Sequence, residues 1–296
     1  IRLSLVGSEM CIRDRINIIL DPILIFGYFG MPRMGIAGAA VATVIGQIIA
    51  AILALVFNLK CNRELNISMK GFRPNGHLIV QIYKVGAPSI VVQAIGSLMT
   101  YGMNLILAAF GSAQTVFGIY FKLQSFVFMP VFGLNNGMVP IIAYNYGAGH
   151  KDRVIKTIKH SVAYGVGIMF VGLLAMHIFP AQLMRMFDAE ESLIAIGAPA
   201  LETISLSFVF AGFCIVAGSV FQALGNGVYS MIVSVARQMC VLLPVAKLLS
   251  LSGEVTLIWW AFPIAELASV LLTSYFLVRI YRKVICHIGE PVVQDA

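Results

Sequence analysis

Seven long apolar runs restrict what this sequence can fold into. A bilayer core of about 30 Å needs roughly 20 apolar residues in one helix, because lipid offers the backbone no hydrogen-bond partners. The predicted spans are residues 35–57, 86–109, 115–142, 159–180, 195–222, 229–251 and 258–280. An eighth run, 16–29, is only about half long enough, and we interpret it as the end of a truncated helix. The sequence therefore predicts an all-α integral membrane protein, a polytopic bundle of seven complete helices and a partial one.

Composition excludes several other classes of protein. Hydrophobic residues make up 59% of the chain and charged residues 11%, against about 25% charged residues in soluble domains. That balance excludes a soluble globule and a disordered chain. The net charge of +7 comes from Lys and Arg between the spans rather than from one basic face, so we expect lipid headgroups and no nucleic acid as neighbours.

The reactive side chains show no pattern of an enzyme. The five Cys residues form no CxxC pair, and the five His residues have no metal-ligand spacing and accompany no nucleophile motif. We therefore predict no enzymatic activity, no bound metal and no cofactor.

The basic residues alternate between the two sides of the predicted bundle. Lys and Arg are concentrated in the segments 58–85 and 151–159 and after the last span, whereas the opposite segments hold only Arg33 and Arg185. Because basic loops stay in the cytoplasm, the C-terminus is predicted to be cytoplasmic. The basic stretch 58–85 is expected to lie along the membrane surface and to join two bundles.

Residues 1–15 match neither a signal peptide nor the spans that follow. They lack an initiator Met and an adequate apolar core, and they end in a charged run. We interpret them as an artefactual leader; the alternative is a genuine cytoplasmic arm.

An acidic residue in the partial span is the sharpest candidate for function. Asn17 and Asp21 are four residues apart and so share one helical face, and Pro22 leaves the carbonyl of Ile18 without its helical donor. Three oxygens in a low-dielectric site suit a proton or Na⁺, and an ionisable group in a span is a functional hypothesis by default. The alternative is that Asp21 is solvated at the helix end.

The next span offers a hydroxyl that is able to complete such a site. Gly38, Ala42, Gly46 and Ala50 form a small-residue ridge for close helix packing, and Thr43 lies on a neighbouring stripe. Thr43 is predicted either to meet Asp21 or to bond its own helix backbone.

Polar side chains also follow two of the later spans. Since lipid cannot satisfy them, they are expected to line a substrate cavity or to bond another helix. The predicted cavity residues are Gln93, Ser97, Thr100, Tyr101, Asn104, Asn135 and Asn136. Four ionisable residues are harder to assign: Glu202 and Lys247 are expected to snorkel, Arg237 to reach a loop carbonyl, and Glu266 has no assigned role.

A weak internal repeat relates the first two runs to the last two. At an offset of 222 residues Pro22 aligns with Pro244, while Asp21 and Thr43 align with Leu243 and Ala265. Such repeats are common in secondary transporters, and here only the earlier copy carries ion-binding chemistry.

Five motifs resemble those of the multidrug and toxic compound extrusion (MATE) family, in its bacterial branch. They are NIILDP at 17–22, GAAVAT at 38–43, GAP at 86–88, PIIAYNYGAG at 140–149 and FQALG at 221–225. The resemblance implies twelve helices in two lobes, a bacterial inner-membrane location, and export of organic cations or drugs by alternating access in exchange for H⁺ or Na⁺. It implies that residues 16–57 end the N-terminal lobe, 58–85 link the lobes, 86–285 form the C-terminal lobe and 286–296 a cytoplasmic tail, in a monomer surrounded by lipid.

The same resemblance implies that Asn17, Asp21 and Thr43 match the family's cation site in the N-terminal lobe. Two alternatives stay open. A flippase for lipid-linked precursors would need several cationic residues in the cavity, where only Lys122 and Arg237 are evident. A non-transporting membrane scaffold is the other, because half of an alternating-access machine has no second lobe to move against.

Overall fold

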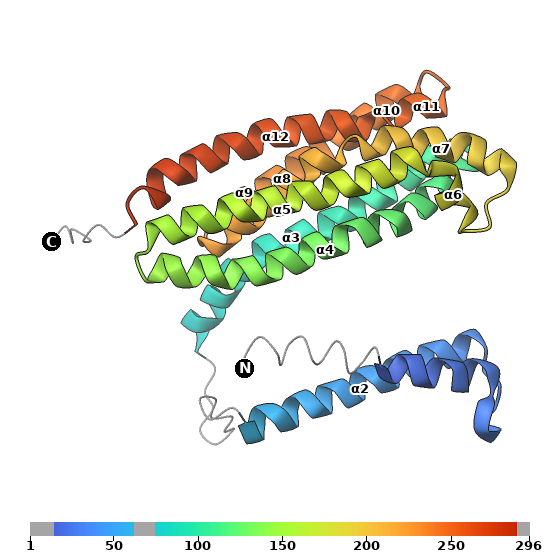
Figure 1. Ribbon diagram of the computed structural model, residues 1–296, viewed down its shortest axis with the longest axis horizontal. Helices are drawn as coiled ribbons and strands as arrows, with labels where there is room; N and C mark the ends of the chain where they lie inside the picture. The colour runs from blue at the N-terminus through green and yellow to red at the C-terminus, as the bar shows by residue number, and fades with distance from the viewer. Residues whose placement is uncertain (1–14, 62–74, 289–296) are drawn as a thin grey trace. The chain divides into compact units, whose positions relative to one another are not determined.

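The computed structural model describes residues 15–61 and 75–288, and within those ranges it contains helices and no strands. The chain divides into two units, Ile1–Asn75 and Gly76–Ala296. Figure 1 shows the long helices of the second unit running along one another as a bundle. The predicted fold class is confirmed.

The first unit is a pair of helices joined by a tight turn. A helix over 15–26 is followed by the 3₁₀ turn η1 (Tyr28–Gly30) and by α2 (Ile36–Cys61). Of the predicted small-residue ridge, Gly38, Ala42 and Gly46 are buried and Ala50 is half-buried. A Cβ added to Gly38 would lie 2.6 Å from the carbonyl carbon of Leu24, so glycine is what lets the two backbones approach this closely.

The second unit contains the remaining six predicted spans. Its α-helices are α3 (Gly76–Leu107), α4 (Ala113–Gly147), α5 (Lys151–Ile178), α6 (Pro180–Arg185), α7 (Glu191–Ser205), α8 (Phe208–Ala223), α9 (Gly227–Val235), α10 (Leu243–Ser250), α11 (Val255–Ile258) and α12 (Ala261–Ile280). Between them lie the 3₁₀ turn η2 (Ala108–Phe110) and the π-helix η3 (Ala236–Leu242), and the π-helix η4 (Tyr281–Ile285) follows α12.

Helices long and apolar enough to cross a membrane cover all seven predicted spans. Six qualify individually, and the seventh is the pair α7 and α8, which is bent by 49°. Ser207 lies at the bend and donates its hydroxyl to the carbonyl of Ile204 at 2.6 Å. A side chain that bonds a carbonyl of the preceding turn competes with the helix ladder, which explains why this span breaks where the hydropathy pattern continues.

The linker between the two units is shorter than the predicted one. α2 extends to Cys61 and α3 begins at Gly76, so both helices enter the predicted linker 58–85. Residues 62–74 and the predicted leader and tail lie outside the described residues, apart from Arg15 and residues 286–288.

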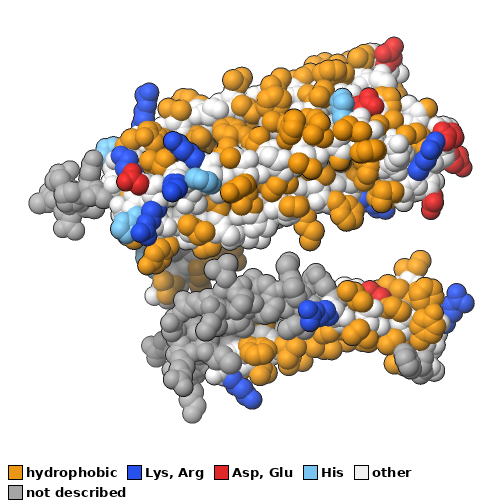
Figure 2. Space-filling view, in the orientation of Figure 1, with side chains coloured by type: hydrophobic (Ala, Val, Ile, Leu, Met, Phe, Trp, Pro, Cys, Tyr) orange, Lys and Arg blue, Asp and Glu red, His pale blue; other side chains and the backbone are white. Residues whose placement is uncertain are grey.

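The surface of the second unit has the distribution that a bilayer demands. On the face drawn in Figure 2, apolar side chains cover the middle, Lys, Arg and His gather towards the α4–α5 turn, and most acidic side chains lie at the opposite end. Large apolar side chains such as Phe126 and Leu271 are highly exposed in this unit. In water such an apolar surface would drive aggregation. In a bilayer the same surface is required, because it contacts the apolar lipid chains.

Inside this unit, aromatic side chains form the centre of the core. Trp259, Tyr120, Phe117, Phe208 and Phe221 are the largest side chains that are fully buried. Helices α5 and α8 approach closely through Gly165 and Gly212, where an added Cβ on Gly212 would lie 3.0 Å from the carbonyl oxygen of Gly165. This packing fixes α8 as one wall of the cavity described next.

Candidate functional site

The second unit contains a partly open cavity of about 1050 Å³. Its walls come from α3, α4, α8, α9, η3 and α12. Several of these walls come from helices with irregular backbone hydrogen bonding: Pro130 and Pro140 lie inside α4, Pro88 lies inside α3, and η3 is a π-helix. Irregular backbone at membrane depth is tolerated where it lines a cavity, and π-helical segments often mark functional sites.

Six aromatic side chains contribute to the cavity wall. Tyr120, Phe121 and Phe262 surround one region, with ring centroids of Tyr120 and Phe262 5.8 Å apart in an edge-to-face arrangement. Phe128, Phe132 and Phe221 line other parts of the same cavity. Aromatic faces attract apolar groups and positive charge, so this wall favours ligands that combine the two.

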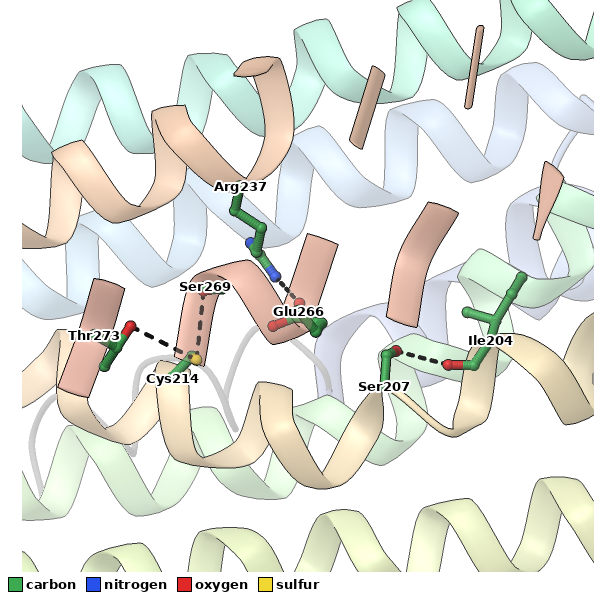
Figure 3. Close-up of polar contacts among 7 residues, drawn as sticks. All are labelled: Ile204, Ser207, Cys214, Arg237, Glu266, Ser269 and Thr273. Carbon is green, nitrogen blue, oxygen red and sulfur yellow. Dashed lines mark hydrogen bonds and ion pairs between the residues drawn. The ribbon is translucent and has the colours of Figure 1, made fainter. Parts of the chain in front are cut away.

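One ion pair lies on the wall, between Arg237 of η3 and Glu266 of α12 (Figure 3). The Glu266 side chain is 8% exposed and that of Arg237 28%, and the Arg237 Nη1 donates to Glu266 Oε1. The predicted contact of Arg237 with a loop carbonyl was wrong: the side chain reaches the neighbouring helix instead. Sequence reasoning missed the pair, although an Arg and a Glu in consecutive spans were a signal for it.

The hydroxyl groups of Ser269 and Thr273, next to this pair, donate to a cysteine sulfur rather than to Glu266. Ser269 and Thr273 lie on the same α12 face as Glu266, three and seven residues further on, and both donate to the sulfur of Cys214 on α8 at 3.4 and 3.6 Å. Figure 3 shows the two hydroxyls converging on that sulfur while Glu266 meets Arg237. The carboxylate therefore receives no hydrogen bond from the hydroxyls of its own helix.

Three buried oxygen acceptors on the wall have no hydrogen-bond partner among the described residues. They are Asn135 Oδ1, Gln238 Oε1 and Glu266 Oε2, each on a residue only 6% exposed. A buried polar atom without a partner costs about 1–3 kcal/mol. The cavity is therefore suited to a ligand that carries positive charge or hydrogen-bond donors.

The structure divides the predicted cavity residues into two groups. Gln93, Asn135 and Asn136 line the cavity, whereas Ser97, Thr100, Tyr101 and Asn104 do not belong to its wall. Two of the second group bond their own helix, since the Thr100 hydroxyl donates to the Gly96 carbonyl and the Asn104 amide to the Thr100 carbonyl.

The predicted cation site lies in the first unit. Asn17 and Asp21 are one turn apart on the helix 15–26, and the Oδ1 atom of each is buried with no hydrogen-bond partner among the described residues. Thr43 on α2 is exposed and donates to the Ala39 carbonyl at 2.9 Å. Of the two alternatives predicted for Thr43, the structure shows the hydrogen bond to its own helix backbone. The Oδ1 atoms of Asn17 and Asp21 receive no hydrogen bond from the described residues.

The fold is a polytopic membrane helix bundle that contains a large, partly aromatic cavity. The MatE family model matches residues 88–248, more than half of the chain. The chain therefore belongs to the MATE family of membrane transporters, as its motifs predict.

Relatives and solved structures agree with this assignment. Multidrug export protein MepA from Staphylococcus aureus is 29% identical over 266 residues, which cover 89% of this chain and 57% of the relative. A structure of the MATE multidrug transporter DinF-BH is 33% identical, with a TM-score of 0.80 over 93% of this chain and 60% of that one. A MOP superfamily transporter from Pyrococcus furiosus shares the fold at 21% identity and a TM-score of 0.82, covering 96% of this chain and 63% of that one. The chain spans little more than half the length of the curated relatives it matches.

Proposed function

We propose that this chain is part of an exporter of organic cations and drugs that works by alternating access and is driven by inward movement of H⁺ or Na⁺. In this proposal residues 86–285 form the C-terminal lobe and residues 16–57 end the N-terminal lobe of a twelve-helix monomer in the bacterial inner membrane, with the C-terminus in the cytoplasm.

The observation that carries the substrate class is the cavity of about 1050 Å³. This volume lies at the upper end of the range for small-molecule sites. Its wall combines aromatic rings with amides such as Gln93 and Asn136, and the buried acceptors on it lack donors. Flat, apolar cations satisfy both kinds of surface at once, because rings attract the positive charge and oxygens accept from attached N–H groups.

Ion coupling is proposed to use Asp21 with Asn17. A carboxylate on an apolar helix is costly unless it binds a proton or a cation, and the Oδ1 atoms of both residues lack partners. Pro22 frees the carbonyl of Ile18 one turn earlier, which supplies a third oxygen. Thr43 is proposed as a further ligand, as the motif implies, because its hydroxyl donates its hydrogen to the Ala39 carbonyl and keeps its oxygen lone pairs for a cation.

Charge on the cavity wall disfavours the flippase alternative. A lipid-linked phosphate calls for several cationic side chains, yet Arg237 is the one Lys or Arg on the wall among the described residues, and Glu266 neutralises it. Lys122 is not on the wall and instead has its ammonium 5.7 Å from the ring centroid of Phe187.

Dye efflux from proteoliposomes tests the proposal. The protein encoded by the longest reading frame that contains this sequence is reconstituted, and efflux of a cationic dye is measured under an imposed proton gradient and then a Na⁺ gradient. We expect one gradient to drive efflux, and we expect Asp21→Asn to abolish the driven component. Asp152→Asn, which removes an exposed carboxylate in the first turn of α5, is the matched control and should leave efflux unchanged.

Two results would count against the proposal. Wild-type protein that moves no dye under either gradient would refute cation export, and lipid-linked substrates would be tested next. Full gradient-driven efflux by Asp21→Asn would refute coupling through the first unit.

A further inference from the structure

Arg237 and Glu266 are the only oppositely charged residues that share the cavity wall among the described residues. Glu266 lies on α12 and Arg237 on η3, so the pair joins two neighbouring walls. A ligand that enters the cavity therefore meets a carboxylate that already holds an internal cation.

We propose that Glu266 anchors the positive charge of the transported cation and that Arg237 is a built-in competitor for the same carboxylate. Arg237 occupies Glu266 until a cationic ligand displaces it. The inference rests on the proposed function and adds the residue that recognises the substrate's charge.

The geometry of the pair leaves one carboxylate oxygen without a hydrogen-bond donor. Arg237 engages Oε1 through a single nitrogen, whereas the strongest Arg–carboxylate pairs use both oxygens in parallel. Glu266 Oε2 is buried and has no partner among the described residues, and the hydroxyls of Ser269 and Thr273 donate to Cys214 rather than to it. One carboxylate oxygen is thus unpaired while Arg237 is still bound to the other.

A displaced guanidinium has other acceptors in the same cavity. Gln238, the next residue along η3, and Asn135 on α4 each present a buried side-chain oxygen without a partner. Leaving an unpaired charge in the low-dielectric interior would be prohibitive, so such acceptors are a requirement for any exchange. Arg237 also lies in a π-helix, whose hydrogen bonds are less regular than those of an α-helix and which often occurs at functional sites.

Aromatic side chains also line the cavity next to the Glu266 carboxylate. Phe262 lies one helical turn before Glu266 on α12, and its ring contacts that of Tyr120, with both residues lining the cavity. A flat cation is therefore able to pack on an aromatic face while its charge approaches Glu266. An uncharged aromatic ligand gains the packing but cannot replace Arg237.

Competition makes a prediction opposite to that of an ordinary structural ion pair. Removal of the Arg237 charge strengthens cation binding, because Glu266 loses its internal partner and the pair's charge changes from zero to −1. Removal of the Glu266 charge weakens it, because Arg237 then repels the ligand. A pair that only stabilises the bundle would change neither affinity selectively.

The experiment measures binding of two probes to purified full-length protein in detergent: ethidium, a permanent cation, and N-phenyl-1-naphthylamine, which is uncharged. We expect Arg237→Met to lower the ethidium Kd about tenfold and Glu266→Gln to raise it about tenfold. The naphthylamine Kd should stay within about twofold in both variants. Arg237→Lys keeps the competing charge and should bind ethidium nearly as the wild type does.

A second neutral variant and a matched control guard against trivial effects. Arg237→Gln removes the charge but retains a hydrogen-bond donor for Glu266, so it tests the same point if Arg237→Met fails to fold. Arg185→Met removes the Arg of an exposed ion pair, Arg185 with Glu191 at 2.9 Å, and should alter neither Kd.

Two outcomes would overturn the inference. If wild type binds ethidium and the folded neutral variants bind it no more tightly, Arg237 is not a competitor, while cation export stands. If wild type binds naphthylamine but not ethidium, both this inference and the proposed substrate class are refuted.

Discussion

Replacement of Gly212 by Ala tests the packing that positions α8 as a wall of the cavity. A Cβ at Gly212 would lie 2.9 Å from Met169 Cγ and 3.0 Å from the carbonyl oxygen of Gly165, both on α5. The carbonyl belongs to a helix backbone and Met169 is fully buried, so neither is free to move aside. Gly118 on α4 is the matched control, because an added Cβ there has no heavy atom within 4 Å.

The magnitude follows from two terms. Ala stabilises a helix interior by about 1 kcal/mol relative to Gly, and this gain applies at both positions. At Gly212 the extra methyl also overpacks the α5–α8 contact, which costs about 1–3 kcal/mol. We therefore expect Gly212→Ala to be less stable than Gly118→Ala by about 1–3 kcal/mol.

Reversible unfolding by SDS titration in mixed micelles measures the two free energies under the same conditions. Far-UV circular dichroism of each folded variant confirms that helix content is unchanged before the titration. If Gly212→Ala matched or exceeded Gly118→Ala in stability, the close approach of α5 and α8 would be refuted.

Three further predictions concern the core, the first unit and the orientation. Trp259 is fully buried and stacks on Phe117 at 6.5 Å, so Trp259→Ala should cost about 3–5 kcal/mol of unfolding free energy by the same titration, and the half-exposed Trp260→Ala far less. Thr43→Val should change stability by no more than about 0.5 kcal/mol and reduce gradient-driven dye efflux less than Asp21→Asn, because it removes one neutral oxygen rather than the charge; unchanged efflux would exclude Thr43 from the ion site. In a variant that retains only Cys286, a membrane-impermeant maleimide should label inverted vesicles and not intact spheroplasts, and the reverse pattern would contradict a cytoplasmic C-terminus.

The spans were predictable because membrane thickness fixes their length and lipid fixes their composition. The same physics does not determine where a span bends. The break between α7 and α8 depends on the hydrogen bond that the Ser207 hydroxyl donates to the Ile204 carbonyl. Hydropathy does not predict that bond. Helix periodicity places Gln93, Thr100 and Asn104 on one face of α3, but it does not give their depth. Gln93 lines the cavity of the second unit, whereas Thr100 and Asn104, further along the same face, donate to carbonyls of their own helix.

The ion pair was missed for a different physical reason. Each charge in a span was considered by itself, and an isolated Arg is expected to snorkel to the interface. A buried charge with an opposite charge on the next helix has a second solution, which needs knowledge of how the helices rotate against each other. That rotation depends on packing contacts between the two spans, such as the stacking of Tyr229 on Phe276 with ring centroids 4.6 Å apart, and no single span encodes it.

The internal repeat does not identify Glu266 as a functional residue. The offset of 222 residues aligns Thr43 with Ala265, so Glu266 falls one position beyond the aligned polar residue. One residue turns a helix by about 100°, which carries the side chain to a different face. The first unit thus holds a carboxylate whose Oδ1 has no partner, and the second a carboxylate with an internal cation. On the two proposals above this difference separates their roles: an open acid exchanges a small ion directly, whereas a neutralised acid responds only to a ligand with enough other contacts to displace Arg237.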